Sequence, residues 1–396
     1  MQDFAGLPVA EPEAIGLSSP ALERFAADML REIGAGRAPG AALMVARAGK
    51  VGFARALGAI RPDGPEMPLD ALFRIYSMTK PIVSVAAMTL VEQGRLFLTD
   101  PLSQFIPAFA ETTVGVVEGG GLTRAAPRRP ILIHDLMRHT SGLCYGFTGG
   151  SRVQREVHAA RLVDPSRDPA AAMETLAALP LMHQPGSAWE YGLSTDVLGR
   201  VVEIVAGASL GEVLRARVLN PLGLVDTQFH TPPQNVARRA EPHGFAMLDA
   251  AGIDRLSHEA PPRFEMAGTG LISTLADYAR FSAMLAGGGA LDGVRIVGPR
   301  TLAFMASQHL APDMAIQDTP LLPPGHGFGL GFAVRTAPGL APSPGAVGDF
   351  FWGGVAGTAF VISPALDMFA VMMVQAAEYR EHFRNLFRNL LAAALL

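Results

Sequence analysis

The chain has 396 residues, 49% of them hydrophobic, which is enough for a large core and about two domains. Its net charge of −4 and isoelectric point near 6.2 give no general attraction to phosphates, so we expect neither nucleic acid nor a membrane as a partner. The single cysteine, Cys144, excludes an internal disulfide and a cysteine-based zinc cluster, and it fits a reducing compartment.

The first predicted elements are a helix and a β-hairpin. Residues 18–36 begin with Ser and Pro and end with Gly, which is the usual punctuation of a helix. Residues 40–58 hold two apolar runs separated by an Ala-Gly turn, which predicts two paired strands. Helical spacing then continues over residues 78–95, where Pro81 is tolerated because it lies near the start. Ser77 is therefore expected at the N-terminus of that helix.

The middle of the chain and its end differ in pattern. Between about residues 100 and 235, helical spacing and long loops predict an inserted helical domain. Strand signals return in residues 327–377, where β-branched and aromatic residues recur between Gly and Pro. We expect an α+β fold, with one antiparallel sheet covered by helices from both chain ends. Residues 1–88 and 236–396 would form this sheet domain, and residues 89–235 the helical domain.

The chain ends suggest a cytoplasmic protein. The first residues carry acids and prolines where a secretory peptide needs basic residues and then an apolar run. Every apolar run, including the C-terminal NLLAAALL, is shorter than the roughly 18 residues that a membrane-spanning helix needs. We interpret the C-terminus as an amphipathic helix that docks on the fold.

Ser209 lies in the string GASLG, which matches the G-x-S-x-G motif of α/β-hydrolase nucleophiles. That motif needs a strand before the serine and a helix after it, whereas the residues before Ser209 have helical spacing. Ser209 and Glu212 fit a capping box, and Thr274 with Asp277 fits another helix cap. We therefore interpret Ser209 as a helix cap.

Ser77 and Lys80, in the string SMTK, are the first candidate catalytic pair. Lys50 and Lys80 are the only lysines in the sequence. Residues three apart on a helix share a face, so the Lys80 amine can reach the Ser77 hydroxyl. A buried lysine can lose its proton and act as a base, whereas arginine does not deprotonate in proteins. The S-x-x-K spacing also arises often by chance, so an ordinary surface lysine stays an alternative.

Two later segments supply the roles that this pair lacks. Tyr191, in WEYGL, lies on a short turn before a helix, where a phenol close to cations can carry a proton. Gly353 and Gly354, in FFWGGV, predict a strand that a substrate carbonyl can approach closely. A backbone N–H there and the N–H of Ser77 can form an oxyanion hole. The alternatives are an ordinary half-buried tyrosine and a glycine-rich strand bend.

Together these motifs resemble the serine hydrolases with the class C β-lactamase fold, and most closely the family VIII carboxylesterases. The matching strings are SMTK, LTDPLSQFIPAF, LMRHTSGL, YGL, HGFGLGF and WGG, and their order covers nearly the whole chain. The resemblance implies a β-lactamase/transpeptidase-like fold. It also implies that Ser77 is the acyl-accepting nucleophile, that Lys80 supports its deprotonation, and that Tyr191 passes the proton to the leaving group.

The resemblance further implies how the substrate is bound. The N–H groups of Ser77 and Val355 would form the oxyanion hole. A class C β-lactamase would be expected to have Lys-Thr-Gly at residues 352–354 and asparagine at Leu193. Because an indole, a glycine and a leucine stand there instead, we expect an apolar pocket that favours uncharged esters over anionic lactams. The residues expected around the substrate are Tyr145, Leu193, Trp352, Gly353 and Gly354.

The predicted function is a serine carboxylesterase that hydrolyses short-chain esters through an acyl-serine intermediate, with slight β-lactam hydrolysis as a side activity. A class C-like β-lactamase, a D-peptidase or an amidase stays open, as does acyl transfer to an alcohol. A non-catalytic binding protein is the alternative from a different class. Neither a cofactor nor a metal is expected, because His134 and His139 lack the i, i+4 spacing of a helical zinc pair and are interpreted as structural.

Overall fold

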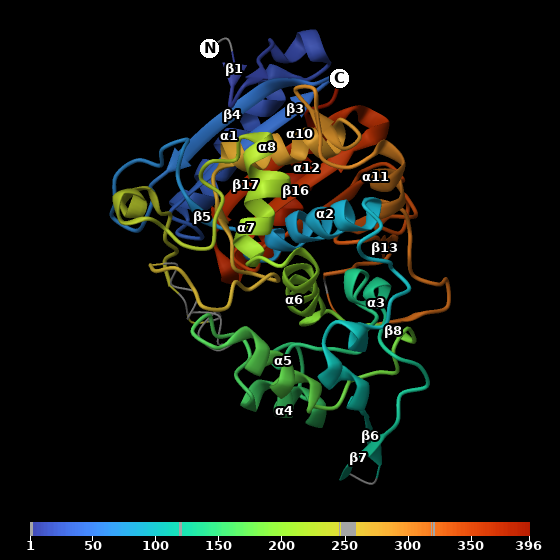
Figure 1. The fold of residues 1–396 in the computed structure, drawn as a ribbon. Helices are drawn as coiled ribbons and strands as arrows, with labels where there is room; N and C mark the ends of the chain where they lie inside the picture. Colours follow the sequence, from blue (N-terminus) through green and yellow to red (C-terminus); the bar gives the residue numbers. More distant parts are fainter. Residues whose placement is uncertain (1–2, 119–120, 245, 247–258, 318, 320) are drawn as a thin grey trace.

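The centre of the fold is one seven-stranded antiparallel sheet (Figure 1). The computed structural model describes residues 3–118, 121–244, 246, 259–317, 319 and 321–396. The strands lie in the order β13-β14-β15-β16-β17-β3-β4, so the prediction of one sheet built from both chain ends is confirmed. The bounds of these strands are β3 (Gly40–Arg47), β4 (Lys50–Gly58), β13 (His326–Phe328), β14 (Ala333–Arg335), β15 (Phe350–Gly353), β16 (Gly357–Ser363) and β17 (Met368–Gln375).

Strand β3 shows why both faces of the sheet are covered. Its side chains alternate between two hydrophobic clusters, with Ala42 and Met44 in one and Leu43 and Val45 in the other. All four residues are fully buried. A strand that is buried on both faces needs apolar residues at every position, which explains the unbroken apolar run that predicted it.

Helices from the two chain ends cover one face of this sheet. There α1 (Ser19–Gly34) packs against α12 (Arg380–Ala393), with the ring centroids of Phe25 and Phe387 6.1 Å apart. The other face is covered by α10 (Leu275–Ala286), which contacts β17 and β16. The predicted docking of the C-terminal helix on the sheet is therefore confirmed.

Helices α3, α4, α5 and α6 lie below the sheet in Figure 1, whereas α8 lies beside α10 and contacts it. Helix α7 continues through a π-helical turn, Arg215–Leu219, into α8. The predicted division at residues 88 and 235 stays a prediction, and α2 runs through residue 88 without a break. The helices not yet given are α2 (Thr79–Glu92), α3 (Ile133–Met137), α4 (Arg152–Ala159), α5 (Pro169–Ala177), α6 (Ser194–Ala206), α7 (Leu210–Leu214), α8 (Asn220–Leu222) and α11 (Pro299–Met305).

Pairs of short strands connect loop segments outside the main sheet. Four of these pairs are antiparallel, and the pair β8-β12 is parallel. Across the described residues, we find no helix with the length and apolar character needed to cross a membrane. The short strands are β1 (Asp3–Phe4), β2 (Leu7–Pro8), β5 (Phe73–Arg74), β6 (Val114–Glu118), β7 (Gly121–Ala125), β8 (Ala188–Trp189), β9 (Ile272–Ser273), β10 (Ala290–Leu291), β11 (Val294–Arg295) and β12 (Ala315–Ile316).

Ser209 caps a helix, as predicted. Its hydroxyl accepts a hydrogen bond from the Glu212 N–H at 3.3 Å, and the Glu212 carboxylate accepts one from the Ser209 N–H at 2.9 Å. This reciprocal pair is a capping box at the start of α7. Thr274 likewise caps α10, where its hydroxyl accepts a hydrogen bond from the Asp277 N–H at 3.1 Å.

Asp277 makes the stability of the fold depend on pH. Its carboxylate is buried and accepts hydrogen bonds from the Asp226 N–H and the Thr227 hydroxyl, both at 2.8 Å. Burial raises the pKa of Asp277 from 3.8 to about 6, because these bonds only partly replace the lost water. The folded state therefore holds a proton between pH 4 and 6 that the unfolded state has released. The contribution of this group to stability is greatest below pH 4 and falls as the pH rises to 6.

Asp277→Asn is expected to remove this pH dependence, because an amide oxygen keeps the two hydrogen bonds but does not ionise. The rise in pKa corresponds to about 3 kcal/mol. The difference in the free energy of unfolding between variant and wild type should therefore shift by about that amount, in favour of the variant, between pH 4 and pH 7. Urea denaturation at both pH values measures it. Equal differences at the two pH values would contradict the prediction.

Candidate active site

Ser77 lies in a 3₁₀ turn, Tyr76–Met78, that leads directly into α2. Tyr76 has a φ of 43°, in the left-handed region that side chains other than glycine rarely adopt. Strain of this kind is typical of functional sites, and here the tight burial of Tyr76 holds it in place. The turn presents the Ser77 side chain at the start of the helix, as the sequence predicted.

Lys80 lies one turn further along α2 and is fully buried. Its amine is 3.4 Å from the Ser77 hydroxyl oxygen, so the predicted pair is brought together. The amine also donates hydrogen bonds to the Gly268 carbonyl oxygen at 2.8 Å and to the Tyr145 hydroxyl at 3.2 Å. All three donors of an ammonium group therefore have acceptors.

Two tyrosines flank the Lys80 amine in different ways. Tyr145 accepts its hydrogen bond, whereas the Tyr191 ring centroid lies 4.6 Å from the amine nitrogen, which is a cation–π distance. The Tyr191 hydroxyl accepts a 3.4 Å hydrogen bond from the indole N–H of Trp352. Tyr145 had been predicted as a wall of the acyl pocket. In the structure its hydroxyl accepts a hydrogen bond from the Lys80 amine, and no local pattern in the sequence indicates that contact.

The turn that carries Tyr191 is fixed against the loop around residues 139–144. A Cβ atom on Gly192 would lie only 2.3 Å from the Leu143 carbonyl oxygen, so only glycine fits there. His139 accepts hydrogen bonds from the Glu190 N–H through its carbonyl, at 2.9 Å, and from the Gly192 N–H through Nδ1, at 3.5 Å. Burial, with a smaller effect of the Lys80 charge, lowers the pKa of His139 well below 6.5, which keeps the ring a neutral acceptor.

His134 pairs with His309, Nε2 to Nδ1, at 2.9 Å. Burial lowers the pKa of His134 to about 4. The two histidines of the string HDLMRH thus serve separate contacts, in agreement with their structural interpretation. Within the described residues, no three or more His, Cys, Asp or Glu side chains lie together in a group that could hold a metal ion.

The segment after β15 lies against the turn that carries Ser77. A Cβ atom on Gly354 would be 2.5 Å from the Ile75 carbonyl oxygen, so glycine is needed for this close approach. The next residue, Val355, is half-buried, and its N–H donates to no backbone acceptor within the described residues. An oxyanion hole requires a backbone N–H that is free to donate to the substrate oxygen, so Val355 stays a candidate for it.

The remaining predicted substrate contacts are largely packed. Leu193 is buried at the N-cap of α6, and the Trp352 ring lies 5.3 Å from the Tyr191 ring centroid. A Cβ atom on Gly353 would meet the Arg384 guanidinium at 2.8 Å. The expectation of an apolar pocket did not include this buried cation, which reaches the site from α12.

Asp196 is a further residue that the sequence interpretation missed. It is buried in α6, and its Oδ1 accepts a hydrogen bond from the Gly268 N–H at 2.8 Å, while the Gly268 carbonyl accepts the bond from Lys80. Its Oδ2 has no hydrogen-bond partner in the described part of the chain. Burial raises the pKa of Asp196, and the Lys80 charge acts in the opposite direction. The three residues form a chain that holds the lysine amine in place.

Comparisons with known proteins show which family the chain belongs to. A family model described as "Beta-lactamase" matches residues 26–395. Protein Rv1367c of Mycobacterium tuberculosis is 38% identical over 320 residues, or 79% of each chain. Esterase EstB of Burkholderia gladioli is 32% identical over 364 residues, which cover 86% of this chain and 87% of EstB.

Among solved structures, the chain is similar to EstCE1, which is described as a hydrolase with promiscuous acyltransferase activity. The TM-score is 0.75 at 26% identity, over 95% of this chain and 98% of EstCE1. The predicted resemblance to esterases with a β-lactamase fold is therefore confirmed. From its motifs, its fold and these matches, the chain belongs to the beta-lactamase family.

Proposed function

We propose that the protein is a serine carboxylesterase that hydrolyses short-chain, uncharged esters through an acyl-Ser77 intermediate. The observation that carries the proposal is the buried Lys80 amine, hydrogen-bonded to the Ser77 hydroxyl and flanked by Tyr145 and Tyr191. The names of EstB, an esterase, and EstCE1, a hydrolase, support the same reaction class.

In the proposed reaction, the Ser77 oxygen attacks the ester carbonyl while its proton passes to Tyr191. In this scheme Tyr191 begins as a phenolate, and the Lys80 ammonium, 4.6 Å from the Tyr191 ring centroid, offsets its charge. The phenolate takes the Ser77 proton and becomes a phenol, which holds that proton for the next step. The N–H groups of Ser77 and Val355 hold the oxyanion. Tyr191 then protonates the departing alcohol, and water releases the acid by the reverse path.

The two tyrosines have different roles in this scheme. Burial raises the pKa of Tyr145 well above 10, and the charges of Asp196 and of an ionised Tyr191 raise it further. Tyr145 therefore stays a phenol that accepts the Lys80 hydrogen bond and orients the amine. The Tyr191 ring faces the Lys80 amine directly, with its centroid 4.6 Å from the amine nitrogen.

The substrate preference rests on Trp352, which stands where a β-lactamase would be expected to have lysine. An indole that donates to Tyr191 offers no charge to a lactam carboxylate, which favours esters. We expect kcat/KM for p-nitrophenyl butyrate to exceed that for a chromogenic cephalosporin by about 100-fold or more. It should also fall along the series from butyrate to laurate. Faster cephalosporin turnover would favour the β-lactamase alternative, and a maximum at laurate would contradict the short-chain preference.

Acyl transfer to an alcohol uses the same intermediate with a different acceptor. The description of EstCE1 as having promiscuous acyltransferase activity makes this the second candidate. Adding butanol to the ester assay distinguishes the two, because transfer yields a butyl ester instead of the free acid.

A cytoplasmic location and the lack of a nucleic acid partner stay predictions from the sequence.

A further inference from the structure

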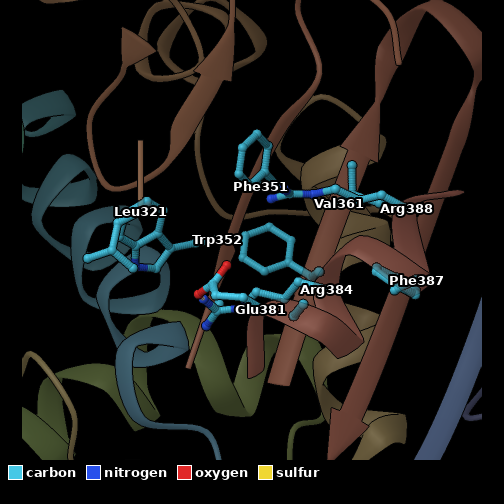
Figure 2. A pocket seen from close by; sticks show the side chains of 11 residues that line it. Leu321, Phe351, Trp352, Val361, Glu381, Arg384, Phe387 and Arg388 are labelled. Carbon is cyan, nitrogen blue, oxygen red and sulfur yellow. Dashed lines mark hydrogen bonds and ion pairs between the residues drawn. The ribbon is translucent and has the colours of Figure 1, made fainter. Parts of the chain in front are cut away.

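Arg384 reaches the candidate oxyanion hole from the C-terminal helix. Its side chain extends from α12 to the turn after β15, and Figure 2 shows it beside Trp352 and Glu381. One guanidinium nitrogen, Nη2, donates a 2.5 Å hydrogen bond to the Gly354 carbonyl oxygen. The other, Nη1, donates to Glu381 at 2.8 Å.

The Gly354 carbonyl and the Val355 N–H belong to the same peptide unit. A peptide is planar, so a bond that fixes its carbonyl oxygen also fixes the direction of its N–H. The Gly357 N–H donates to the same oxygen at 2.9 Å, and the Gly354 N–H donates to the Thr358 carbonyl at 2.8 Å. Of these contacts, the one from Arg384 alone carries a full charge. A cation on the carbonyl draws electron density from the amide and makes its N–H a stronger donor.

Burying the charged Arg384 side chain costs free energy of desolvation, and its ion pair with Glu381 does not fully offset that cost. Burial lowers the pKa of Arg384, and its Nε has no hydrogen-bond partner in the described part of the chain. Glu381, its carboxylate partner, also lies 3.4 Å from Arg380 and is 37% exposed. A buried charge with so little compensation is expected where it has a function.

The space around Arg384 does not suit a substrate group. The cavity beside it, lined by Phe351, Gly353 and Arg388 among others, holds only about 30 Å³. This is far below the roughly 300 to 1,000 Å³ of a typical ligand pocket, so the cavity does not suit a substrate carboxylate with its carbon chain. A substrate group cannot reach Gly353 from this side either, because the Arg384 guanidinium occupies the space where a side chain on Gly353 would be.

We propose that Arg384 is a positioning residue for the oxyanion hole. It orients and polarises the peptide between Gly354 and Val355, so that the Val355 N–H points at the developing oxyanion. Its charge adds to this stabilisation through the peptide. The inference rests on the proposed esterase function and adds a residue to it.

The test compares Arg384→Gln and Arg384→Lys with a matched control, Arg388→Gln. Arg388 lies one turn further along α12, and its guanidinium stacks on Phe351 at 4.4 Å from the ring centroid. For each protein, kcat and KM are measured with p-nitrophenyl butyrate. Inhibition by butylboronic acid is measured too, because its adduct with the serine places a tetrahedral oxygen in the oxyanion hole.

Arg384→Gln is expected to lower kcat about 10- to 100-fold with KM nearly unchanged, and to weaken boronate inhibition by a similar factor. Arg384→Lys keeps the charge and should lose less, while Arg388→Gln should stay within about 3-fold of wild type. A folded Arg384→Gln variant with wild-type kcat, a loss confined to KM, or an equal loss in Arg388→Gln would overturn the inference.

If Arg384→Gln does not fold, the positioning role is tested on Arg384→Lys by its boronate affinity and its kcat. Wild-type values of both in Arg384→Lys would overturn the inference. A wild type that neither turns over the ester nor labels at Ser77 with a fluorophosphonate would overturn the proposed function itself. By contrast, an active wild type with equally active Arg384 variants would leave the esterase function in place and overturn only the role of Arg384.

Discussion

Ser77→Ala is expected to lower kcat for p-nitrophenyl butyrate by about 10⁴- to 10⁶-fold, because the acyl group then has no nucleophile to bind. The hydroxyl oxygen of Ser77 is one of the three acceptors of the Lys80 amine, at 3.4 Å. Removing it leaves the site otherwise intact, since alanine fits the same turn. Circular dichroism and the thermal midpoint should match the wild type, so the loss can be assigned to chemistry.

The matched control is Ser209→Ala, which removes the other serine with a nucleophile-like motif. Ser209 caps α7 by accepting a hydrogen bond from the Glu212 N–H, so its loss should cost about 1 kcal/mol of stability. Ester turnover should stay within about 2-fold of wild type. A folded Ser209→Ala protein without activity, or an active Ser77→Ala protein, would show that the wrong serine has been assigned.

Tyr191→Phe is expected to lower kcat by about 10²- to 10⁴-fold, because the phenol that carries the proton is lost while the ring packing stays. The matched variant is Tyr145→Phe, which removes one of the three acceptors of the Lys80 amine. Its loss should be about 10-fold or less, since the raised pKa of Tyr145 keeps that side chain a protonated phenol in the wild type.

Single-turnover and steady-state measurements on both variants test this ranking. If Tyr145→Phe loses far more than Tyr191→Phe, the proton carrier is Tyr145, and Tyr191 serves as the aromatic partner of the ammonium. Equal losses in both would indicate a shared proton path, which would contradict the division of roles proposed from the contacts of Lys80.

Local patterns in the sequence predicted the parts of the fold that depend on near neighbours. The hairpin of β3 and β4 has the predicted bounds because its apolar runs and its turn are contiguous. Ser77 and Lys80 meet because a three-residue step on a helix puts both side chains on one face. The cap at Ser209 is local in the same sense, since its partner is three residues away.

The contacts that complete the site join segments far apart in the sequence, so no local sequence pattern predicts them. Gly268 lies 188 residues from Lys80, and Trp352 lies 161 residues from Tyr191. Arg384 was not predicted because the C-terminal helix shows only an amphipathic pattern, which indicates docking and not which charged residue turns inward. The left-handed conformation of Tyr76 was missed for a related reason: tertiary packing, and not the residue type, imposes it.

The most direct test of the account is to locate the acyl group during turnover. The enzyme is mixed with p-nitrophenyl butyrate, quenched in acid within the steady state, digested and analysed by mass spectrometry. We predict one butyryl group on the peptide that contains Ser77, and none on that peptide in Ser77→Ala. A butyryl group on Ser209 or on another side chain, or sustained turnover with no acylated peptide, would contradict the acyl-Ser77 mechanism.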